Sequence, residues 1–245
     1  DHFDSIFCAG PHHLKEIRAT EEKYQLPPKK LIEHGYGRLD AIIANRKSAK
    51  LPPANNPKRI LIAPSWGKHS LVETIGNQVV SHLLESKFHV TLRPHPQTVK
   101  YAKVQLKKIL ERHKNNHNFD LEVNIAGQDS LHRADLMISD WSGAALDYSF
   151  GLGKPVLFID VPRKVNNPEY ELLDIIPFEV WIRNNIGKIQ SADQLDSLID
   201  SVNELLSDNT YTNVGLIAQQ NVFNIGKSAQ VGAKYLAQLV EGSDC

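Results

Sequence analysis

Residues 59–70 read Arg-Ile-Leu-Ile-Ala-Pro-Ser-Trp-Gly-Lys-His-Ser, a short apolar run followed by a polar turn. An apolar run of this length, bounded by turn residues, is typical of a strand that is buried on both faces. The next segment, Leu71 to Leu84, repeats apolar residues on one helical stripe and predicts an amphipathic helix. Strand, loop and helix in this order form the repeating unit of an α/β fold with a parallel sheet.

The same alternation continues on both sides of this segment. Further strands are expected at residues 5–9, 30–34, 88–93, 121–123, 136–139 and 156–159. Further helices are expected at residues 12–25, 99–113, 142–150, 194–206, 213–223 and 228–240. Strands that alternate with helices predict a Rossmann-like domain, in which helices cover both faces of a parallel sheet. Residues 47–58 are rich in proline and asparagine, and they are the best linker in the chain.

The composition excludes several classes of protein. Lys and Arg together number 28, as do Asp and Glu, so no overall positive charge favours nucleic acid and no such partner is expected. The cysteines, Cys8 and Cys245, exclude a disulfide framework and a zinc ribbon, and indicate a reducing compartment. The longest apolar runs, such as 155–159, are far shorter than the roughly 18 residues of a membrane-spanning helix. Because Met137 is the only methionine, we expect a processed protein or part of a longer one.

Ligands of open α/β sheets bind beyond the carboxyl ends of the strands, so the residues after each expected strand are candidates for a site. In the loop at 64–70, Gly67 allows a ligand to approach the backbone, Lys68 can balance a phosphate, and Ser70 can cap the next helix. An ordinary turn with a solvated lysine explains these residues equally well. Residues 160–164 can form a pocket wall, although a solvated loop is the simpler interpretation.

A second candidate is Arg93-Pro94-His95-Pro96, which ends the strand expected at 88–93. The two prolines restrict the backbone around His95, so the imidazole loses little entropy when it is held in place. A histidine can donate a hydrogen bond to a phosphate or exchange a proton near neutral pH. We therefore favour a functional His95 over an incidental histidine at a rigid strand exit.

A third candidate spans residues 139–147, where the small residues Ser142, Gly143 and Ala144 begin an expected helix. The N–H groups and the dipole at a helix N-terminus together form an anion-binding site. Asp147 lies about one turn further along and can accept hydrogen bonds from the ribose hydroxyls of a nucleotide. The simpler alternative is a plain N-cap by Ser142, with Asp147 on a solvated face.

Six segments, taken in order, resemble the CDP-glycerol glycerophosphotransferase family of teichoic-acid and capsule synthesis. They are residues 35–40 (similar to G-x-P-R-x-D), 62–66 (similar to Y-A-P-T-[WY]), 93–96, 139–148, 154–158 and 226–229. Two departures stand out. Gly37 occupies the place of a usual proline, and Trp141-Ser142-Gly143 replaces a more typical Tyr-Ser-Ser.

The resemblance implies a GT-B fold, which consists of two Rossmann-like domains. Residues 1–46 would be the C-terminal end of the N-terminal (acceptor) domain, and residues 47–58 the linker. Residues 59–223 would form the donor-binding domain, and residues 224–245 a C-terminal helix that packs back toward the N-terminal domain. Most of the N-terminal domain, with a histidine thought to act as base on the acceptor, would then belong to upstream sequence.

The resemblance also implies an activity: the transfer of a glycerophosphate, or a related polyol-phosphate or sugar unit, from a nucleotide-activated donor to a polymer acceptor. CDP-glycerol is the expected donor. His95 and Arg93 would be catalytic, because they would offset charge on the departing pyrophosphate. The donor-binding residues would be Ser65, Trp66, Gly67, Lys68, Pro94, Ser139, Asp140, Ser142, Gly143, Ala144 and Asp147. Neither a metal nor another cofactor is expected. The acceptor would be lipid-linked, which implies a cytoplasmic protein at the inner face of the membrane.

Other functions are compatible with the same residues. GT-B sugar-nucleotide glycosyltransferases and UDP-N-acetylglucosamine 2-epimerases share the fold and a Ser/Gly-rich phosphate loop. The epimerase pattern D-S-G-G-x-Q-E-E, however, matches residues 140–147 poorly. A non-catalytic nucleotide- or polymer-binding module would keep the fold without turnover. The donor's identity, the acceptor and the oligomeric state stay open at this point.

Overall fold

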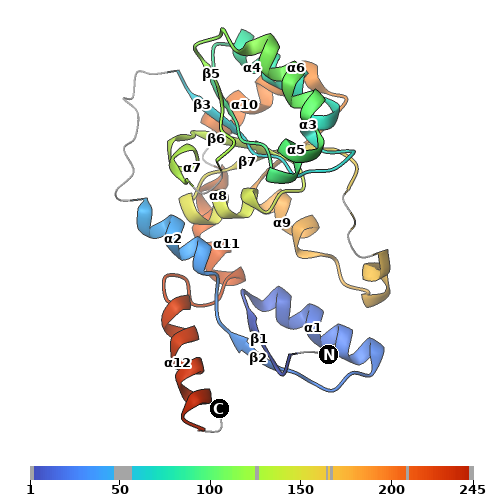
Figure 1. Ribbon diagram of the computed structural model, residues 1–245, viewed down its shortest axis with the longest axis vertical. Coiled ribbons are helices and arrows are strands. Elements are labelled where there is room, and N and C mark those ends of the chain that lie inside the picture. Colours follow the sequence, from blue (N-terminus) through green and yellow to red (C-terminus); the bar gives the residue numbers. More distant parts are fainter. Residues whose placement is uncertain are drawn as a thin grey trace.

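The structure is a computed structural model that describes residues 3–46, 57–124, 127–163, 165, 168–207 and 210–242. Most of the expected linker, residues 47–56, therefore lies outside the described residues, as does Cys245. The described residues form a six-stranded sheet with its helices, in the upper part of Figure 1, and a smaller two-stranded sheet below it.

The strands and helices have the following bounds. The strands are β1 Ser5–Cys8, β2 Lys30–Glu33, β3 Arg59–Ile62, β4 His89–Leu92, β5 Phe119–Leu121, β6 Leu136–Ser139, β7 Val156–Asp160 and β8 Gly187–Ser191. The α-helices are α1 Pro11–Tyr24, α2 Gly37–Asn45, α3 Leu71–Thr74, α4 Gly76–Glu85, α5 Pro96–Tyr101, α6 Lys103–His113, α7 Asp129–Arg133, α8 Ala144–Leu152, α9 Phe178–Ile186, α10 Leu198–Ser207, α11 Val214–Asn221 and α12 Ser228–Val240. The 3₁₀ turns are η1 Pro168–Leu173, η2 Leu195–Ser197 and η3 Thr210–Asn213.

The large sheet is parallel throughout, with the strand order β5-β4-β3-β6-β7-β8. The chain builds outward from β3 to β5 and then returns to place β6 on the other side of β3. This is the order of a doubly wound Rossmann sheet, and its direction reverses between β3 and β6. Ile60 of β3 pairs with Leu136 of β6, and Ile62 pairs with Ile138. The predicted α/β fold with a parallel sheet is therefore confirmed.

Helices cover both faces of this sheet because successive side chains of a strand point to opposite faces. In β3, Ile60 and Ile62 pack in one core with residues of α3, α4, α6 and α10. Leu61, between them, packs in a second core with residues of α2, α8, α9 and α11. A continuous apolar run is thus buried on both sides, as the sequence predicted.

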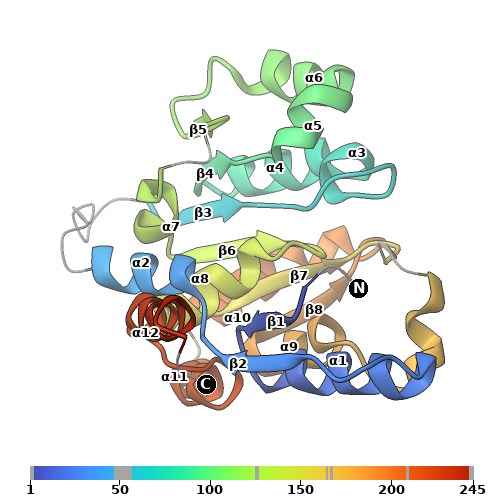
Figure 2. The ribbon, with the colours of Figure 1, turned by 60° about the horizontal axis from the view of Figure 1, so that its bottom comes forward.

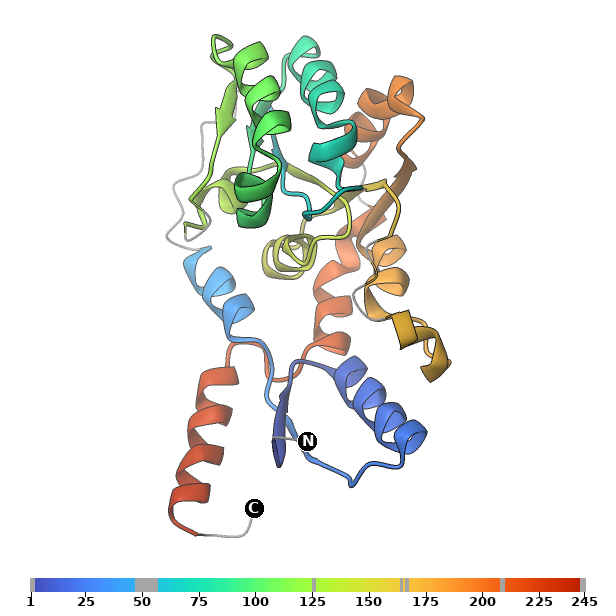
Figure 3. The same cartoon turned by 45° about the vertical axis from the view of Figure 1, so that its right-hand side comes forward.

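The N-terminal residues form a separate small layer in which β1 and β2 pair in parallel. Helix α12 packs against this layer, since Tyr235 meets the Phe7 ring at 5.6 Å between centroids and its hydroxyl lies 2.7 Å from the Ser5 hydroxyl. Figures 2 and 3 show α12 beside α2 and alongside the small sheet. The two ends of the described chain are therefore held together.

A carboxylate at the start of α2 fixes the beginning of α12. Asp40 accepts hydrogen bonds from the backbone N–H groups of Gly226 (2.5 Å) and Ser228 (3.0 Å), and from the Ser228 hydroxyl (2.5 Å). Just before α2, Gly35 adopts a φ of +98°, and a Cβ there would meet the Phe223 carbonyl oxygen at 2.3 Å. Only glycine tolerates both conditions. The segments at 35–40 and 226–229, far apart in sequence, thus form one junction.

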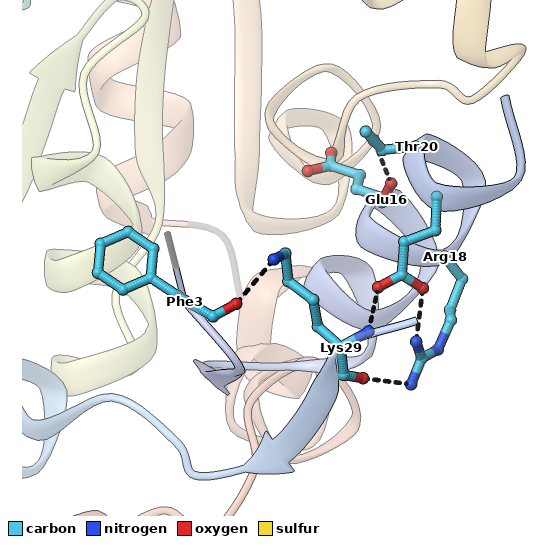
Figure 4. A network of polar contacts seen from close by, with 6 residues as sticks. Phe3, Glu16, Arg18, Thr20 and Lys29 are labelled. Carbon is cyan, nitrogen blue, oxygen red and sulfur yellow. Dashed lines mark hydrogen bonds and ion pairs between the residues drawn. The ribbon is translucent and has the colours of Figure 1, made fainter. Parts of the chain in front are cut away.

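Helix α1 is tied to the strand that follows it by a buried carboxylate (Figure 4). Glu21 accepts from Arg18 Nη1 at 2.5 Å and from the backbone N–H of Lys29 at 2.7 Å. Lys29 Nζ in turn donates to the Phe3 carbonyl oxygen at 2.7 Å. These contacts fix the orientation of α1 relative to β1 and β2.

Several elements differ from the sequence-based expectation. Helices α2, α7 and α9 and strand β8 lie where no regular element was expected. The single helix expected at 71–84 is divided at Ile75, whose φ of −118° and ψ of 7° leave the helical region. The helix expected at 99–113 is divided in the same way at Ala102. Strand β5 begins at Phe119, two residues before the expected start.

The edge pairing of β7 with β8 depends on the absence of a side chain at Gly187. A Cβ there would lie 1.8 Å from the Val156 carbonyl oxygen, so the two strands would have to separate. We expect Gly187→Ala to lower the free energy of unfolding in urea by about 1–3 kcal/mol. Gly215→Ala in α11, where nothing lies within 4 Å of the added carbon, is the control and should not destabilise the protein. Equal stability of both variants would contradict this account.

The contact of α1 with α9 makes stability depend on pH. The rings of His12 and Phe178 stack at 4.0 Å, and burial, with neighbouring His13, lowers the pKa of His12 from 6.5 to about 4. Between these values the unfolded chain binds more protons than the native one, so stability falls as the pH drops from 6.5 to 4. His12→Gln should flatten this part of the profile in urea unfolding, and His117→Gln, at an exposed position, should not. An NMR titration that placed the pKa of His12 near 6.5 would contradict the prediction.

Candidate functional site

A pocket of about 270 Å³ opens beyond the carboxyl ends of β3, β4 and β6, where the direction of the sheet order reverses. The pocket brings together the ends of three strands, the first turns of α5 and α8, and side chains from α2 and α7. The lining residues are Arg38, Ala63, Pro64, Arg93, Pro94, His95, Pro96, Leu131, Ser142, Gly143, Ala144 and Asp147. The structure thus gathers residues of the candidate segments 93–96 and 139–147 in one place, together with Pro64 of the loop at 64–70.

The N-terminus of α8 forms one wall of this pocket. The helix begins at Ala144, with Gly143 as N-cap, two residues later than expected from the sequence. Ser142 Oγ accepts a hydrogen bond from the Ala144 N–H at 3.3 Å. No atom lies within 4 Å of the place of a Cβ on Gly143, so the backbone is open to a ligand on this side. The positive end of the helix dipole therefore faces the pocket.

His95 also lines the pocket and is held by two contacts. It is the N-cap of α5, and its Nδ1 accepts the backbone N–H of Gln97 at 3.1 Å. Because that N–H can only donate, a neutral His95 carries its proton on Nε2. The ring also lies parallel to the indole of Trp66, with centroids 6.0 Å apart. The imidazole is therefore fixed with a donor nitrogen on the side away from the helix.

Arg93 lines the pocket and also holds the segment between β5 and α7. Its Nη1 donates to Ser130 Oγ at 2.9 Å and its Nη2 donates to the Gly127 carbonyl oxygen at 2.8 Å. Glu122 lies 3.9 Å away. Burial lowers the pKa of Arg93 below its usual value, and the side chain stays a cation at neutral pH. Its position is thus determined by the loop as well as by the pocket.

Arg38 was not among the sequence-predicted site residues, although the segment at 35–40 contains it. From α2, its Nε donates to Asp147 Oδ2 at 2.5 Å. The Asp147 side chain is 8% exposed and that of Arg38 is 42% exposed. Burial raises the pKa of Asp147 above its usual 3.8, and Arg38 opposes the rise. A ribose that reached Asp147 would share its carboxylate with Arg38.

Asp140 and Ser139 hold the loops from behind the pocket. Asp140 accepts the backbone N–H of Ser65 at 2.6 Å and that of Leu71 at 2.9 Å. Ser139 Oγ donates to the Ala63 carbonyl oxygen at 2.7 Å. Both residues are buried and neither is among the lining residues, so their side chains position the strand ends. Asp140 therefore caps α3, and the cap expected from the Ser70 side chain is wrong because that side chain makes no such bond.

The loop after β3 contributes less to the pocket than its sequence suggested. Ser65, Trp66, Gly67 and Lys68 are not among the lining residues. Ser65 is buried, Lys68 is exposed, and Gly67 takes a φ of +118° at the turn. Trp66 approaches the site through its contact with His95. Apart from Pro64, this loop therefore lies beside the pocket.

Metal-ligand clusters and membrane-spanning helices are both absent from the described residues. No three His, Cys, Asp or Glu side chains of the described ranges gather as ligands for a metal ion. None of the described helices is both long and apolar enough to cross a membrane.

The family model of CDP-Glycerol:Poly(glycerophosphate) glycerophosphotransferase matches residues 4–224. The chain belongs to this family. The match includes the small N-terminal layer and the six-stranded sheet, so the resemblance seen in the sequence is confirmed. A comparison with curated proteins gives no match.

Several solved structures are similar to this member of the glycerophosphotransferase family. The UDP-GlcNAc 2-epimerase of Methanocaldococcus jannaschii is 17% identical, with a TM-score of 0.59 over 96% of this chain and 61% of that chain. The enzyme of the same name from Neisseria meningitidis is 19% identical, with a TM-score of 0.57 over 96% and 61%. The wall teichoic acid polymerase TagF is 16% identical, with a TM-score of 0.45 over 97% and 58%. The chain thus spans about three fifths of the length of these proteins. At such identities the epimerases show the fold alone, and the expected GT-B-type architecture is confirmed.

Removing Arg38 and removing Asp147 should destabilise the protein to different extents. Arg38→Gln leaves a buried carboxylate without its cation, whereas Asp147→Asn leaves a half-exposed guanidinium in contact with water. We expect Arg38→Gln to cost about 1–3 kcal/mol at pH 7.5 in urea unfolding, and Asp147→Asn to cost less.

The free energy of unfolding lost in Arg38→Gln should become smaller as the pH falls. Without Arg38 the pKa of Asp147 rises further, since Arg38 is the chief influence that lowers it. The native state then takes up a proton at a higher pH, and the buried carboxyl becomes neutral. Unfolding curves at pH 7.5 and pH 4.5 test this, with the double variant as control. A loss that does not depend on pH would contradict it.

Proposed function

We propose that this chain is the donor-binding part of a transferase that moves glycerophosphate from CDP-glycerol to a poly(glycerophosphate) acceptor. The observation that carries the proposal is the gathering of two arginines and several hydrogen-bond donors around one pocket, in which the Asp147 carboxylate pairs with Arg38. Arg38, Arg93, His95 and the N-terminus of α8 surround a space of about 270 Å³. Such a set of groups suits the diphosphate of an activated donor. The family membership supplies the substrate class.

In the proposed step, an acceptor hydroxyl attacks the β-phosphorus of CDP-glycerol. A new phosphorus–oxygen bond forms, the bond to the bridging oxygen breaks, and CMP leaves. The hydroxyl proton passes to a base, and negative charge grows on the departing phosphate. His95 Nε2–H and the cation of Arg38 would offset this charge, and the backbone around Gly143 and Ala144 would hold the phosphate.

Several finer assignments belong to the same proposal. Phosphate charge is offset by protein groups, with no role given to a metal ion or another cofactor. Asp147 is proposed to set the position of Arg38 as well as to face the nucleotide. Teichoic-acid or capsule polymers would be the acceptors, and the enzyme would work at the inner face of the cell membrane.

The donor site can be tested by calorimetric titration of this chain with CDP-glycerol, CDP, UDP and UDP-N-acetylglucosamine. His95→Asn is the sharpest variant, because asparagine can replace Nδ1 as an N-cap but lacks the donor at Nε2. We expect it to weaken CDP-glycerol binding about tenfold or more. His69→Asn, in an exposed part of the neighbouring loop outside the pocket lining, should leave the affinity unchanged.

The choice among nucleotides decides between the candidate functions. Tighter binding of the cytidine ligands supports the proposed donor. A preference for UDP-N-acetylglucosamine that is lost in His95→Asn would favour a sugar transferase or an epimerase instead. If His95→Asn and His69→Asn bound CDP-glycerol equally well, the proposed role of His95 would be wrong.

A further inference from the structure

A second and larger hollow, of about 590 Å³, lies between α1, η1 and α9. Figure 3 shows η1 beside α1, with α9 above them. The Tyr24 hydroxyl of α1 donates to Glu169 of η1 at 2.9 Å and joins the two elements. The lining residues are Glu16, Ile17, Thr20, Trp141, Arg163, Val165, Tyr170, Leu173, Ile175, Pro177 and Glu179. We call this hollow the α1–α9 pocket.

The 270 Å³ pocket lined by Arg38, Arg93 and His95 is called the cationic pocket, and the α1–α9 pocket adjoins it through a single peptide unit. Trp141 lines the former, and Ser142, the next residue, lines the latter. Consecutive Cα atoms are about 3.8 Å apart, so ligands in the two pockets would approach each other across this loop. Both pockets lie beyond the carboxyl ends of the strands, where β6 and β7 end.

The polar groups of the α1–α9 pocket differ in kind from those of the cationic pocket. Glu16 and Glu179 supply carboxylates, Thr20 supplies a hydroxyl, and Arg163 supplies the cation of the lining. Carboxylates accept hydrogen bonds and cannot donate them when ionised, so they suit a ligand rich in hydroxyl groups. Burial and the nearby Glu179 carboxylate raise the pKa of Glu16. A nucleoside diphosphate, with several negative charges, would meet two carboxylates here.

Trp141 is a fixed wall of this pocket. Its indole Nε1 donates to the Val161 carbonyl oxygen at 2.9 Å. The guanidinium of Arg183 lies 3.9 Å from the ring centroid and is held in turn by Asp160 at 3.0 Å. Arg163 approaches the same ring at 5.7 Å and the Tyr170 ring at 4.5 Å. Contacts of this kind orient the aromatic surface before a ligand arrives.

Glu16 is placed by a helix that is fixed elsewhere. The Arg18–Glu21–Lys29 contacts anchor α1, and Figure 4 shows the Glu16 side chain pointing away from Arg18. Neither Glu21 nor Arg18 lines the pocket. The carboxylate that reaches the pocket is therefore distinct from the one that holds the helix.

We propose that the α1–α9 pocket binds the end of the acceptor: a hydroxyl-rich polyol or sugar unit joined to one phosphate. The inference rests on the proposed function, since it assigns the second substrate of that reaction. Glu16, Glu179 and Thr20 bond the hydroxyl groups, and the guanidinium of Arg163 contacts the phosphate. The apolar side chains and Trp141 cover the carbon backbone of the unit. A terminal hydroxyl then points past Trp141 toward the donor phosphate.

The three tryptophans of the chain, Trp66, Trp141 and Trp181, make a direct test possible. The protein is labelled with 5-fluorotryptophan, and each ¹⁹F resonance is assigned by a Trp→Phe variant. The acceptor probe is glycerophosphoglycerol, which has one phosphodiester between two glycerol units, and the donor probe is CDP. We expect glycerophosphoglycerol to shift the Trp141 resonance and CDP to shift that of Trp66, which stacks on His95.

Two substitutions of residues that line the pocket test its affinity for glycerophosphoglycerol. Arg163→Gln should weaken glycerophosphoglycerol about tenfold, and Glu179→Gln about threefold, while both leave CDP binding unchanged. Glu22→Gln is the matched control, because Glu22 is exposed on α1 and lies outside the pocket. Far-UV circular dichroism of each variant checks that the fold is kept.

The outcomes separate this inference from the proposed function. If glycerophosphoglycerol shifts Trp66, shifts nothing, or binds Arg163→Gln and Glu179→Gln with unchanged affinity, the acceptor assignment is overturned. The proposed function would still stand in that case, provided that CDP shifts Trp66. If CDP shifts Trp141 and leaves Trp66 unchanged, the donor site is misplaced and the proposed function fails with it.

Discussion

The parallel pairing of β3 with β6 is the constraint on which the other features depend. Because these strands are neighbours although their paired residues are 76 positions apart in the chain, the loops after them meet at one edge. Asp140 strengthens this contact, since its two carboxylate oxygens accept backbone N–H groups from the loop after β3. Those two bonds cross from the end of β6 to the turn at Ser65 and to the start of α3. Without them the pocket wall on the β3 side would lose its buried support.

The charge of the pocket depends on a segment outside the large sheet. Arg38 belongs to α2, which precedes residues 47–56, yet it pairs with Asp147 on α8. Asp40, two residues further, fixes the start of α12. One short helix therefore links the pocket to the junction between the large sheet and the small N-terminal layer. Any movement of that layer relative to the sheet would act on α2 and would change the position of a cation in the site.

The sequence was most informative where a polar cluster follows a buried apolar run. Arg93 to Pro96 and residues 142–147 were assigned to a site on that ground, and the structure brings both to one pocket. Contacts between residues far apart in the chain could not be predicted, because no local sequence pattern indicates them. The Arg38–Asp147 pair joins residues 109 positions apart, and the backbone amides that bond to Asp140 belong to residues 75 and 69 positions away. Strand β8 lies at an edge and has a mixed burial pattern, so it gave no clear apolar run.

In the proposed reaction, the two pockets would divide the chemistry of the transfer between them. A donor with a diphosphate needs positive groups that stabilise charge as it grows, and the cationic pocket concentrates Arg38, Arg93 and a helix N-terminus. An acceptor needs its hydroxyl held close to phosphorus, and carboxylates serve this purpose while they repel the donor. The loop at Trp141 and Ser142 separates these environments by one peptide unit. Under the proposed assignment, opposite charge on its two sides would give each substrate one favourable place, and this placement would keep donor and acceptor in order.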